Sequence, residues 1–551
     1  MGPAQAHLVS RSEIARLAGV ERPAVTNWQR RHQDFPKPLT TADGEMFRRD
    51  EVVAWLASRQ IPTKGLRAGE TPGTTYGDRL VATAAGNDSR RASPAVVGSD
   101  GRRALNDVVW RLHDLSRTTA RDGDYWQVLL ALMFVQRFRP DVWQVFAAES
   151  DVADTPARLS SSFEMSGLPD AARAVRHLTT VTPTAQQTLA GVIGILTEFA
   201  GSAAPSRALQ DDHVATLFDY AFDRLAEEVR YAFVTPRSLA RLIGDLVGPV
   251  AGGERCVDPF CRGGELLVEL ARSAGKPPVA PIQIAGTHPD PRMVELARMN
   301  VAMHRFDGSP LELIEQGEPR VRGSADVVVT NPPFGALPNE AAANGPFGSA
   351  RRKETALLQS AISSLTEDGR GAVVMPQLAA FGKGTADREM RRALVEAGAV
   401  AAVVALPAGL FAETTIGVTL WLIRRPRGSA TDVLFIDART AGEAASRGRR
   451  TLRPEDIKSI VDEYRRWRST SPTGVPFEPS AGMSAVVSPA LISTRDYSLL
   501  PSTYVAAESS QTVGVSWHDL TVVRAELAQL VDRAKAVDSE AHEMLEGLGG
   551  G

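Results

Sequence analysis

One stretch of the chain reads Asp326-Val327-Val328-Val329-Thr330-Asn331-Pro332-Pro333-Phe334-Gly335. Its run of apolar and β-branched residues predicts a buried strand. Because proline has no N–H to donate to a sheet ladder and cannot continue a helix, the strand must end at Asn331. Ligands of open α/β sheets bind at the carboxyl ends of the strands. Asn331 is therefore predicted to face a ligand.

The tetrapeptide after the strand has the groups needed to hold a planar amine. The side-chain oxygen of Asn331 and the carbonyl of Pro332 can each accept a hydrogen bond from one NH2 group. Phe334 offers a flat face for the heterocycle that carries the amine. Held through both hydrogens, the amine would direct its lone pair at an electrophile. The alternative is an ordinary proline-rich turn after a buried strand.

Composition sets the broad class of protein. A chain of 551 residues is long enough for several domains. A formal net charge of −3 excludes a basic surface as a whole, so nucleic-acid contacts must come from local patches. The two cysteines, Cys256 and Cys261, form neither a disulfide framework nor a zinc ligand set. No apolar run reaches the length of a membrane span. We expect a soluble, cytoplasmic protein that needs no metal.

Two motifs lie upstream of Asn331. In Tyr231-Ala232-Phe233-Val234-Thr235-Pro236-Arg237, Thr235 is predicted to cap a helix with Pro236 at its first position. The second motif reads Arg255-Cys256-Val257-Asp258-Pro259-Phe260-Cys261-Arg262-Gly263-Gly264-Glu265-Leu266-Leu267. A strand that ends in an acid, a glycine turn and an apolar helix are typical of the first βα unit of a doubly wound sheet.

Together these motifs resemble the methylase subunits of type I restriction-modification systems, in the γ class of adenine-N6 DNA methylases. The resemblance spans residues 104–505 and is strongest over residues 231–423. It implies an α/β fold with a Rossmann-like sheet that binds S-adenosylmethionine, preceded by a helical domain. It also implies that Asn331, Pro332, Pro333 and Phe334 are catalytic. The residues implied to bind the cofactor in these motifs are Thr235, Pro236, Asp258, Pro259, Gly263 and Gly264.

The chain departs from the family pattern around the cofactor. Arg262 stands where the first glycine of the turn belongs, and a positive φ there would cost on the order of 1 kcal/mol or more. After the strand predicted over residues 281–285, His288 stands where the family has the acid that binds the ribose. Asp290 would replace that acid only if the loop shifts. Glu318 is the candidate for contact with the cofactor adenine.

Residues 1–60 form a separate unit with helix-turn-helix spacing, a hairpin around Asp43-Gly44 and a closing helix that contains Val52 and Leu56. The unit resembles the winged helix-turn-helix of excisionases and MerR-like regulators. The resemblance places a set of polar residues in the major groove and two arginines at phosphates. These are Thr26, Asn27, Gln29, Arg30 and Arg31 for the groove, and Arg48 and Arg49 for the phosphates. The alternative is a small module that binds another protein.

The remaining segments complete the predicted organisation. Residues 61–103, rich in Gly, Pro, Ser, Thr and Ala, are predicted to be a flexible linker. The predicted domains after it are a helical domain at 104–228, the methyltransferase domain at 229–430 and a C-terminal extension at 431–551. Within them we expect a mobile loop at 336–352 and an amphipathic helix at 522–545. That helix would pack either on a partner subunit or on its own domain.

The predicted function is transfer of a methyl group from S-adenosylmethionine to N6 of an adenine flipped out of double-stranded DNA. Too little chain follows the methyltransferase domain for target recognition. A separate specificity subunit, or the N-terminal unit, would then choose the DNA sequence, and a nuclease subunit would complete a restriction-modification system. Two alternatives stay open: a catalytically degenerate protein that binds DNA or regulates, and a methyltransferase that acts on RNA or on a protein glutamine.

Overall fold

The structure is a computed structural model of the 551-residue chain. It describes residues 8–18, 20, 22–32, 34–41, 44–62, 73–78, 108–109, 111–112, 115, 123–147, 155–182, 184–201, 207–228, 234–273, 281–304, 314–317, 324–338, 344–411, 416–426, 428–446, 449–473 and 477–505.

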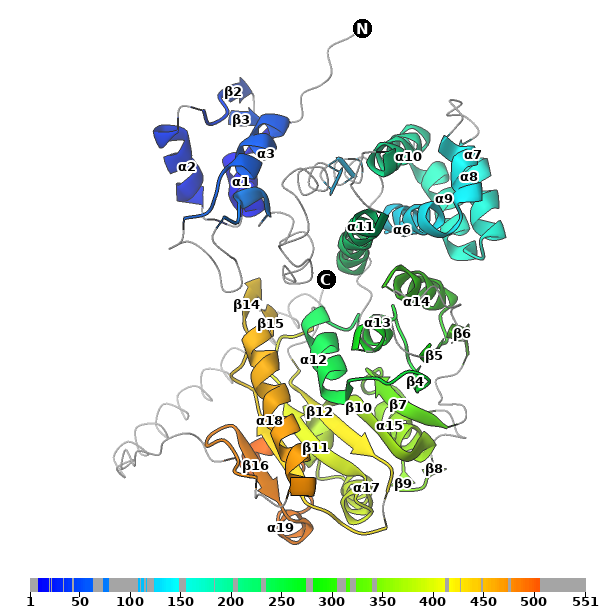
Figure 1. Ribbon diagram of the computed structural model, residues 1–551, viewed down its shortest axis with the longest axis vertical. Coiled ribbons are helices and arrows are strands. Elements are labelled where there is room, and N and C mark those ends of the chain that lie inside the picture. The colour runs from blue at the N-terminus through cyan, green and yellow to red at the C-terminus, as the bar shows by residue number, and fades with distance from the viewer. Residues whose placement is uncertain are drawn as a thin grey trace, which may run out of the picture.

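In the part of the chain that the structure describes, nine strands form one mixed sheet in the order β16-β13-β11-β12-β10-β7-β4-β5-β6 (Figure 1). The strands are β4 (Arg255–Asp258), β5 (Gln283–His288), β6 (Ile314–Gln316), β7 (Ala325–Thr330), β10 (Leu365–Pro376), β11 (Val400–Ala405), β12 (Val418–Arg424), β13 (Val433–Asp437) and β16 (Ser484–Val487). Strands β10, β7, β4, β5 and β6 are parallel neighbours. Their carboxyl ends therefore share one edge, as predicted for a doubly wound sheet.

Helices cover both faces of this sheet. One face packs against α12 (Arg237–Val247), α13 (Glu265–Ser273), α14 (Pro291–His304) and α18 (Pro454–Thr473). The other face packs against α15 (Lys353–Ser364), α16 (Gln377–Phe381), α17 (Thr385–Glu396) and α19 (Pro489–Thr494). Strand β11, most of β7 and residues 371–376 of β10 are apolar because both of their faces are buried.

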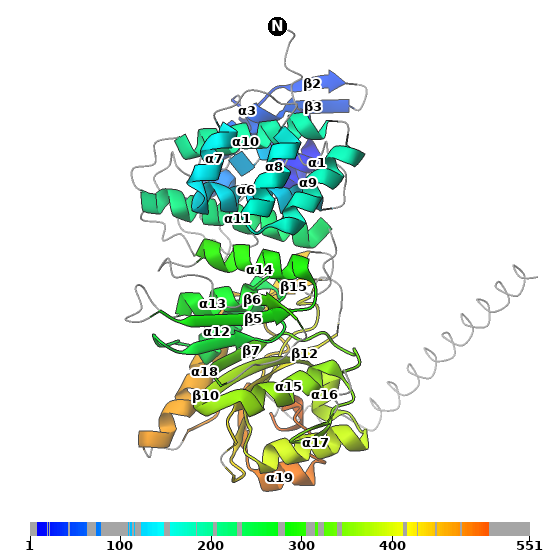
Figure 2. The ribbon, with the colours of Figure 1, turned by 90° about the vertical axis from the view of Figure 1, so that its right-hand side faces the viewer.

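A helical domain stacks on α14 (Figure 2). It consists of α6 (Asp124–Phe138), α7 (Pro140–Ala147), α8 (Thr155–Met165), α9 (Pro169–Val181), α10 (Ala185–Gly201) and α11 (Arg207–Glu228). Helix α6 is buried over most of its circumference, as its apolar sequence predicts.

Helix α14 belongs to two cores at once. Its residues Met293, Leu296, Met299 and Met303 lie in the core of the helical domain. Val294, Ala297 and Val301, on the other side of α14, lie in the core under the sheet. The carboxylate of Glu295 also accepts hydrogen bonds from the N–H groups of Asp170 and Ala171, at 2.8 and 2.9 Å, and so binds the first turn of α9. The helical domain is thus joined to the sheet by a shared helix.

Two predicted boundaries are wrong. Strands β13 and β16 pair with the central sheet, so the sheet continues through Val487 instead of giving way to an extension at residue 431. Residues 61–103 are not all linker, because Ile61 is buried and Tyr76 packs on the ring of Trp28 with centroids 4.7 Å apart. The first unit therefore includes Ile61 and residues 74–78. Composition did not predict that residues 74–78 pack against the first unit, because the segment between Ile61 and residue 74 is rich in glycine and polar residues.

The N-terminal unit consists of α1 (Arg11–Ala18), α2 (Arg22–Arg31), α3 (Arg49–Ser58) and a small sheet. That sheet has the order β1-β3-β2, with β1 (Leu8–Ser10), β2 (Pro38–Thr41) and β3 (Gly44–Arg48). Strands β2 and β3 form the predicted hairpin, with Thr41 paired to Gly44. Val25, Phe47 and Leu56 fill the core. The predicted order of two helices, hairpin and closing helix is present.

Two predicted features fall outside the described residues, namely the helix at 522–545 and Glu318. Within the described ranges, no helix is both long enough and apolar enough to cross a bilayer. Over the same ranges, no group of three or more His, Cys, Asp or Glu side chains is arranged so that it could bind a metal ion.

Candidate active site

Asn331 lies at the carboxyl end of β7 and is 1% exposed. Its side-chain Nδ2 donates a hydrogen bond to Thr235 Oγ1 at 3.1 Å. Its backbone carbonyl accepts one from Arg262 Nε at 2.8 Å. Among the described residues, no group donates a hydrogen bond to Asn331 Oδ1 or to the Pro332 carbonyl. The two acceptors predicted for the amine are therefore available.

Thr235 has a different role from the predicted helix cap. Helix α12 begins at Arg237, its N-cap residue is Pro236, and no side chain bonds the cap. The prediction was wrong by one residue. Pro236 is the N-cap and not the first helical residue, because its carbonyl accepts a hydrogen bond from the N–H of Ala240 in the first turn. Thr235 is instead 1% exposed and holds the amide of Asn331, which lies 96 positions along the chain. No local pattern in the sequence could reveal that contact.

A partly buried ion-pair cluster fixes the segment that carries Thr235. Arg237 pairs with Asp219 at 2.9 Å and with Asp223 at 3.0 Å, both on α11. His304 at the end of α14 lies 3.0 Å from the same Asp219 carboxylate. Burial alone would raise the pKa of Asp219, but the charges of Arg237 and His304 outweigh burial and hold that pKa below its usual value. Helices α11, α12 and α14 thus meet beside Thr235.

The loop after Asn331 is held by a buried carboxylate that sequence reasoning missed. Glu354, on α15, is fully buried, and its Oε2 accepts a hydrogen bond from the N–H of Gly335 at 3.0 Å. Burial raises the pKa of Glu354. Phe334 is half-buried, with its ring edge-on to Phe411 at a centroid distance of 6.4 Å. Pro333 beside it is also half-buried, so the tip keeps part of its surface open.

Part of residues 336–352, the segment predicted to be a mobile loop, forms regular structure. Residues 344–345 and 348–349 pair as a short hairpin, β8 (Asn344–Gly345) and β9 (Gly348–Ser349). The side chain of Gln359, on α15, binds two neighbouring residues of this hairpin. It accepts a hydrogen bond from the N–H of Phe347 at 2.9 Å and donates one to the carbonyl of Gly348 at 3.0 Å. A buried amide therefore anchors a segment whose composition resembles a loop.

The glycine turn between β4 and α13 carries the predicted acid. Asp258 is 2% exposed and its Oδ1 accepts a hydrogen bond from the N–H of Phe260 at 3.0 Å. Burial raises the pKa of Asp258 to about 7, although that bond and the charge of Arg262 both lower it. The carbonyl of Pro259 accepts from Thr287 Oγ1 at 2.9 Å, which ties the turn to β5.

Arg262 has the positive φ that its place in the turn predicts, with φ at 41°. Its side chain is buried, and its guanidinium carbon lies 4.9 Å from the centroid of the Phe260 ring. Burial lowers the pKa of this guanidinium to about 10. Arg262 thus links the turn to the backbone of Asn331, so it does not simply crowd the site.

The two glycines after Arg262 both have a physical reason. Gly264 has φ +81°, and a Cβ there would lie 3.1 Å from the Cα of Ala297. A Cβ on Gly263 would lie 2.3 Å from Cζ of Phe222, a residue of α11. The carbonyl of Gly263 accepts from Asn300 Nδ2 at 2.8 Å. The helical domain therefore rests directly on the turn.

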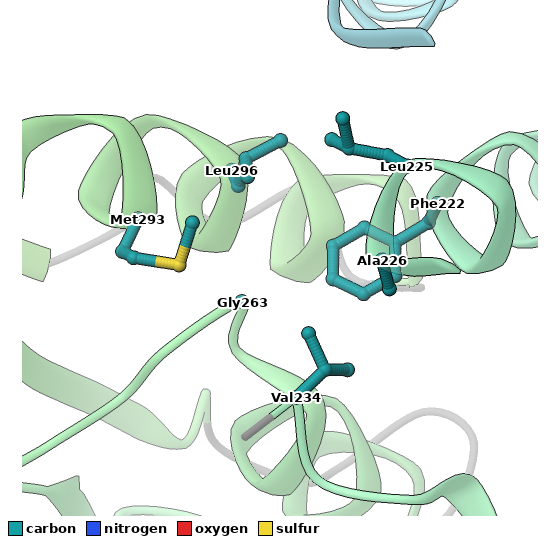
Figure 3. Close-up of a pocket in the computed structure, with 7 residues that line it drawn as sticks. All are labelled: Phe222, Leu225, Ala226, Val234, Gly263, Met293 and Leu296. Atoms are coloured by element: carbon teal, nitrogen blue, oxygen red, sulfur yellow. The ribbon is translucent and has the colours of Figure 1, made fainter. Parts of the chain in front are cut away.

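A small apolar cavity lies at this junction (Figure 3). Figure 3 shows Phe222 of α11 reaching toward Gly263, with Val234 on one side and Met293 on the other. The remaining lining residues are Leu225, Ala226 and Leu296. The cavity holds about one water molecule. It is a packing gap between the domains, too small for a nucleoside.

Glu265, the first residue of α13, is a site residue that sequence reasoning did not select. It is 8% exposed, and its Oε1 has no hydrogen-bond partner among the described residues. Burial raises the pKa of Glu265 to about 7. Its position one residue after the glycines was the available signal, because an acid there must face the turn or the solvent.

Neither His288 nor Asp290 offers a free carboxylate where the family has the acid that binds the ribose. His288 is buried at the end of β5, and its Nδ1 accepts from the N–H of Asp290 at 3.1 Å. Burial lowers the pKa of His288 to about 4, so the neutral ring carries its proton on Nε2 and can donate one hydrogen bond. Both carboxylate oxygens of Asp290 bind Arg292, at 2.9 to 3.3 Å. The possible compensation by Asp290 is therefore not formed.

The predicted DNA-contact residues lie on α2 and at the end of β3. Asn27, Arg30, Arg31 and Arg48 are exposed, and Thr26 is half-buried. Gln29 accepts two hydrogen bonds from Arg11, at 3.0 and 2.8 Å. Arg49, predicted with Arg48 to reach phosphates, is the first residue of α3. Two exposed arginines near the end of α2 and a third at the end of β3 suit phosphate contact, and the DNA-binding role stays a prediction.

The arrangement suits a reaction in which an amine receives a group from a positively charged molecule bound beside it. Asn331 and Pro332 offer two acceptors, while Asp258 and Glu265 place two carboxyl groups on the glycine turn that leads into α13. His288 adds one donor at the adjacent strand end. Buried carboxyl groups and an unbonded oxygen fit the amino-acid end of S-adenosylmethionine, which carries an ammonium group.

A family model described as N-6 DNA Methylase matches residues 209–512. The methylase subunit of the type I restriction enzyme HindI from Haemophilus influenzae is 26% identical over 354 residues, which are 61% of this chain and 79% of that protein.

Solved structures share the fold. The methyltransferase subunit of a type I restriction-modification system from Streptococcus thermophilus matches with TM-score 0.57 and 20% identity, over 74% of this chain and 100% of that one. A chain from a structure on complex assembly of the type I restriction-modification system matches with TM-score 0.58 and 21% identity, over 79% of this chain and 99% of that one.

Proposed function

Because the chain belongs to the N-6 DNA methylase family, we propose that Asn331, Pro332 and Phe334 hold the adenine that receives the methyl group. The chain is an adenine-N6 DNA methyltransferase that uses S-adenosylmethionine. The observation that supports these residue roles is the bond from Asn331 Nδ2 to Thr235. That bond commits the NH2 group of the amide to Thr235 and leaves Oδ1, an acceptor, without a donor among the described residues.

The steps follow from these atoms. The target adenine leaves the duplex, because its N6 cannot be reached inside the base stack. Its two N6 hydrogens bond Asn331 Oδ1 and the Pro332 carbonyl, and its ring lies against Phe334. This geometry localises the N6 lone pair and points it away from the acceptors. When bound, S-adenosylmethionine would supply a methyl group on a positively charged sulfur; N6 would take that methyl group, the sulfur would keep the electron pair of the broken bond, and N6 would afterwards lose one proton.

The cofactor residues are part of the same proposal. Asp258 and the glycine turn at Gly263 and Gly264 would hold the amino-acid end, and His288 Nε2–H would donate to a ribose hydroxyl. Thr235 and Pro236 would lie near the reacting methyl. A neutral imidazole gives one hydrogen bond where a carboxylate accepts two, so ribose binding should be weaker than with an acid.

Substitution of Asn331 tests the proposal. Asn331→Ala should lower methyl transfer to DNA by about 100-fold or more, because it removes one of the two acceptors. Binding of S-adenosylmethionine, measured by calorimetry, should persist. The matched control is Asn344→Ala, which changes an exposed asparagine in β8. Equal activity of Asn331→Ala and the control would refute the role of Asn331. No cofactor binding by the wild type would favour the degenerate DNA-binding alternative.

We also propose that separate subunits choose the DNA sequence and cleave. The support is similarity to a HindI methylase subunit and to a chain from a type I assembly structure. Affinity purification of the full chain from its own cells, followed by mass spectrometry, should recover a specificity subunit. Recovery of the chain alone, together with site-specific methylation by that purified chain, would refute a separate subunit.

The N-terminal unit would then add non-specific DNA contacts. Exposed Arg30 and Arg31 lie near the end of α2, and Arg48 ends β3. Replacing Arg30 and Arg31 by glutamine should weaken DNA binding and reduce its salt dependence, because fewer counterions are released. Unchanged affinity and salt slope would favour the protein-interaction alternative for this unit.

A further inference from the structure

Glu265 is a buried acid that the steps above do not use. It is the first residue of α13, and acids are common there because the helix dipole stabilises them. Such residues normally lie in water or bond the backbone. Glu265 is 8% exposed and its Oε1 has no partner among the described residues. A buried oxygen without a partner is costly, so the fold alone does not explain this side chain.

The Glu265 carboxyl group faces the turn itself. A Cβ added to Gly263 would lie 3.2 Å from Glu265 Oε1, so this oxygen lies against the glycine, beside the ring of Phe222. Asp258 lies at the other end of the same turn. The two acids therefore bracket residues 259–264, the segment that packs against both α11 and β5.

The cationic side chains around Asp258 and Glu265 are bound to other groups. The charged groups that influence Glu265 are Arg262, Asp258 and Arg237. Arg237 is committed to Asp219 and Asp223, and Arg262 donates to the Asn331 carbonyl and lies over Phe260. Burial raises the pKa of both Asp258 and Glu265 to about 7 in spite of these arginines. A small cation bound between the two acids would reverse that effect.

We propose that Glu265 is a ligand for the ammonium group of the methyl donor, with Asp258 as the second carboxylate of that site. This inference rests on the proposed function, because it assumes that S-adenosylmethionine binds at the turn. The ligand it specifies is a nucleoside whose amino-acid chain carries an ammonium group. An adenosine derivative without that chain would not use Glu265.

The test compares ligands with and without the ammonium group. Calorimetry would measure binding of S-adenosylmethionine, S-adenosylhomocysteine and 5′-methylthioadenosine to the full chain. The first two carry the ammonium group, and the third lacks the amino-acid chain. Glu265→Gln should weaken the first two by about 10- to 100-fold and leave the third unchanged, since it removes one charge-assisted bond. The control is Glu269→Gln, another buried acid of α13 that pairs with Arg272.

The outcomes separate this inference from the function on which it rests. If the wild type binds no S-adenosylmethionine, the proposed function fails. If the wild type binds it and Glu265→Gln binds equally well, only the role of Glu265 is refuted. Equal weakening of all three ligands would mean that the substitution damages the fold, and would also refute a specific contact with the ammonium group.

The wild type provides a measurement that needs no variant. Deprotonation of Glu265 and Asp258 should strengthen S-adenosylhomocysteine binding severalfold between pH 6 and pH 7.5. This range lies below the pKa of about 7.7–8 at which an α-amino group loses its proton. Binding of 5′-methylthioadenosine should stay constant. A flat profile for both ligands would overturn the proposal.

Discussion

Replacing Thr235 with valine removes one oxygen from the active site and keeps the size of the side chain. The Thr235 hydroxyl accepts the hydrogen bond from Asn331 Nδ2 at 3.1 Å, and both residues are 1% exposed. Valine offers no acceptor, so the Asn331 amide would lie with its NH2 group against a methyl. We expect the amide to rotate by half a turn and place its NH2 where the adenine amine should bind.

The size of the effect follows from the cost of the unbonded group. A buried donor without a partner costs about 1–3 kcal/mol, and the rotated amide avoids that cost by turning its NH2 outward. The productive orientation would then be disfavoured by the same amount. With 1.36 kcal/mol for each factor of ten, the rate constant of methyl transfer should fall about 5- to 150-fold.

Single-turnover transfer of labelled methyl groups to unmethylated genomic DNA measures this rate constant. Binding of S-adenosylmethionine should be nearly unchanged in Thr235→Val. Thr235→Ser keeps the oxygen and should recover most of the rate. If the valine variant instead loses cofactor affinity and keeps its rate, Thr235 acts only as a cofactor contact and the orientation argument is wrong. Equal loss in the serine and valine variants would refute it as well.

Three further changes test the surroundings. Gly263→Ala should destabilise the fold by about 1–3 kcal/mol in denaturant unfolding, because its Cβ would lie 2.3 Å from Phe222; Phe222→Ala should restore part of the loss, and additive losses would contradict this. Glu265→Gln should raise the free energy of unfolding at pH 8 by up to roughly 3 kcal/mol, and not at pH 5. The folded pKa of about 7 lies above the ordinary value of 4.5, so the wild type loses stability as pH rises through 7; a gain that is equal at both pH values would be inconsistent. Arg237→Met should cost at most about 3–5 kcal/mol, because it leaves the partly buried Asp219 and Asp223 without their main cation; an unfolding curve like that of the wild type would count against the cluster.

The sheet and its catalytic tip could be predicted because local patterns encode them. The valines of β7 and the two prolines specify a buried strand and its end, and the glycine turn specifies the first βα unit. Even the departure at Arg262 predicted a real feature, since that residue has φ 41°. These features depend on residues that are neighbours in the chain.

Contacts across long separations could not be predicted in the same way. The bond from Asn331 to Thr235 joins residues 96 positions apart, and the packing of Phe222 on Gly263 joins two domains. Glu265 was not selected because an acid at the start of a helix is common, and only its burial marks it as unusual. The predicted boundary at residue 431 was wrong because β13 and β16 still pair with the sheet. They follow β12 in the chain, where strands and helices no longer alternate regularly.

Helix α14 decides where this protein can be divided. A fragment that starts after α11 would expose Met293, Leu296, Met299 and Met303 to water, and the helical domain without α14 would lose the Glu295 carboxylate that holds α9. Neither piece should be expressed as a stable fragment. A chimera that exchanges helical domains with a relative should therefore carry α14 with them, although it follows β5 in the chain.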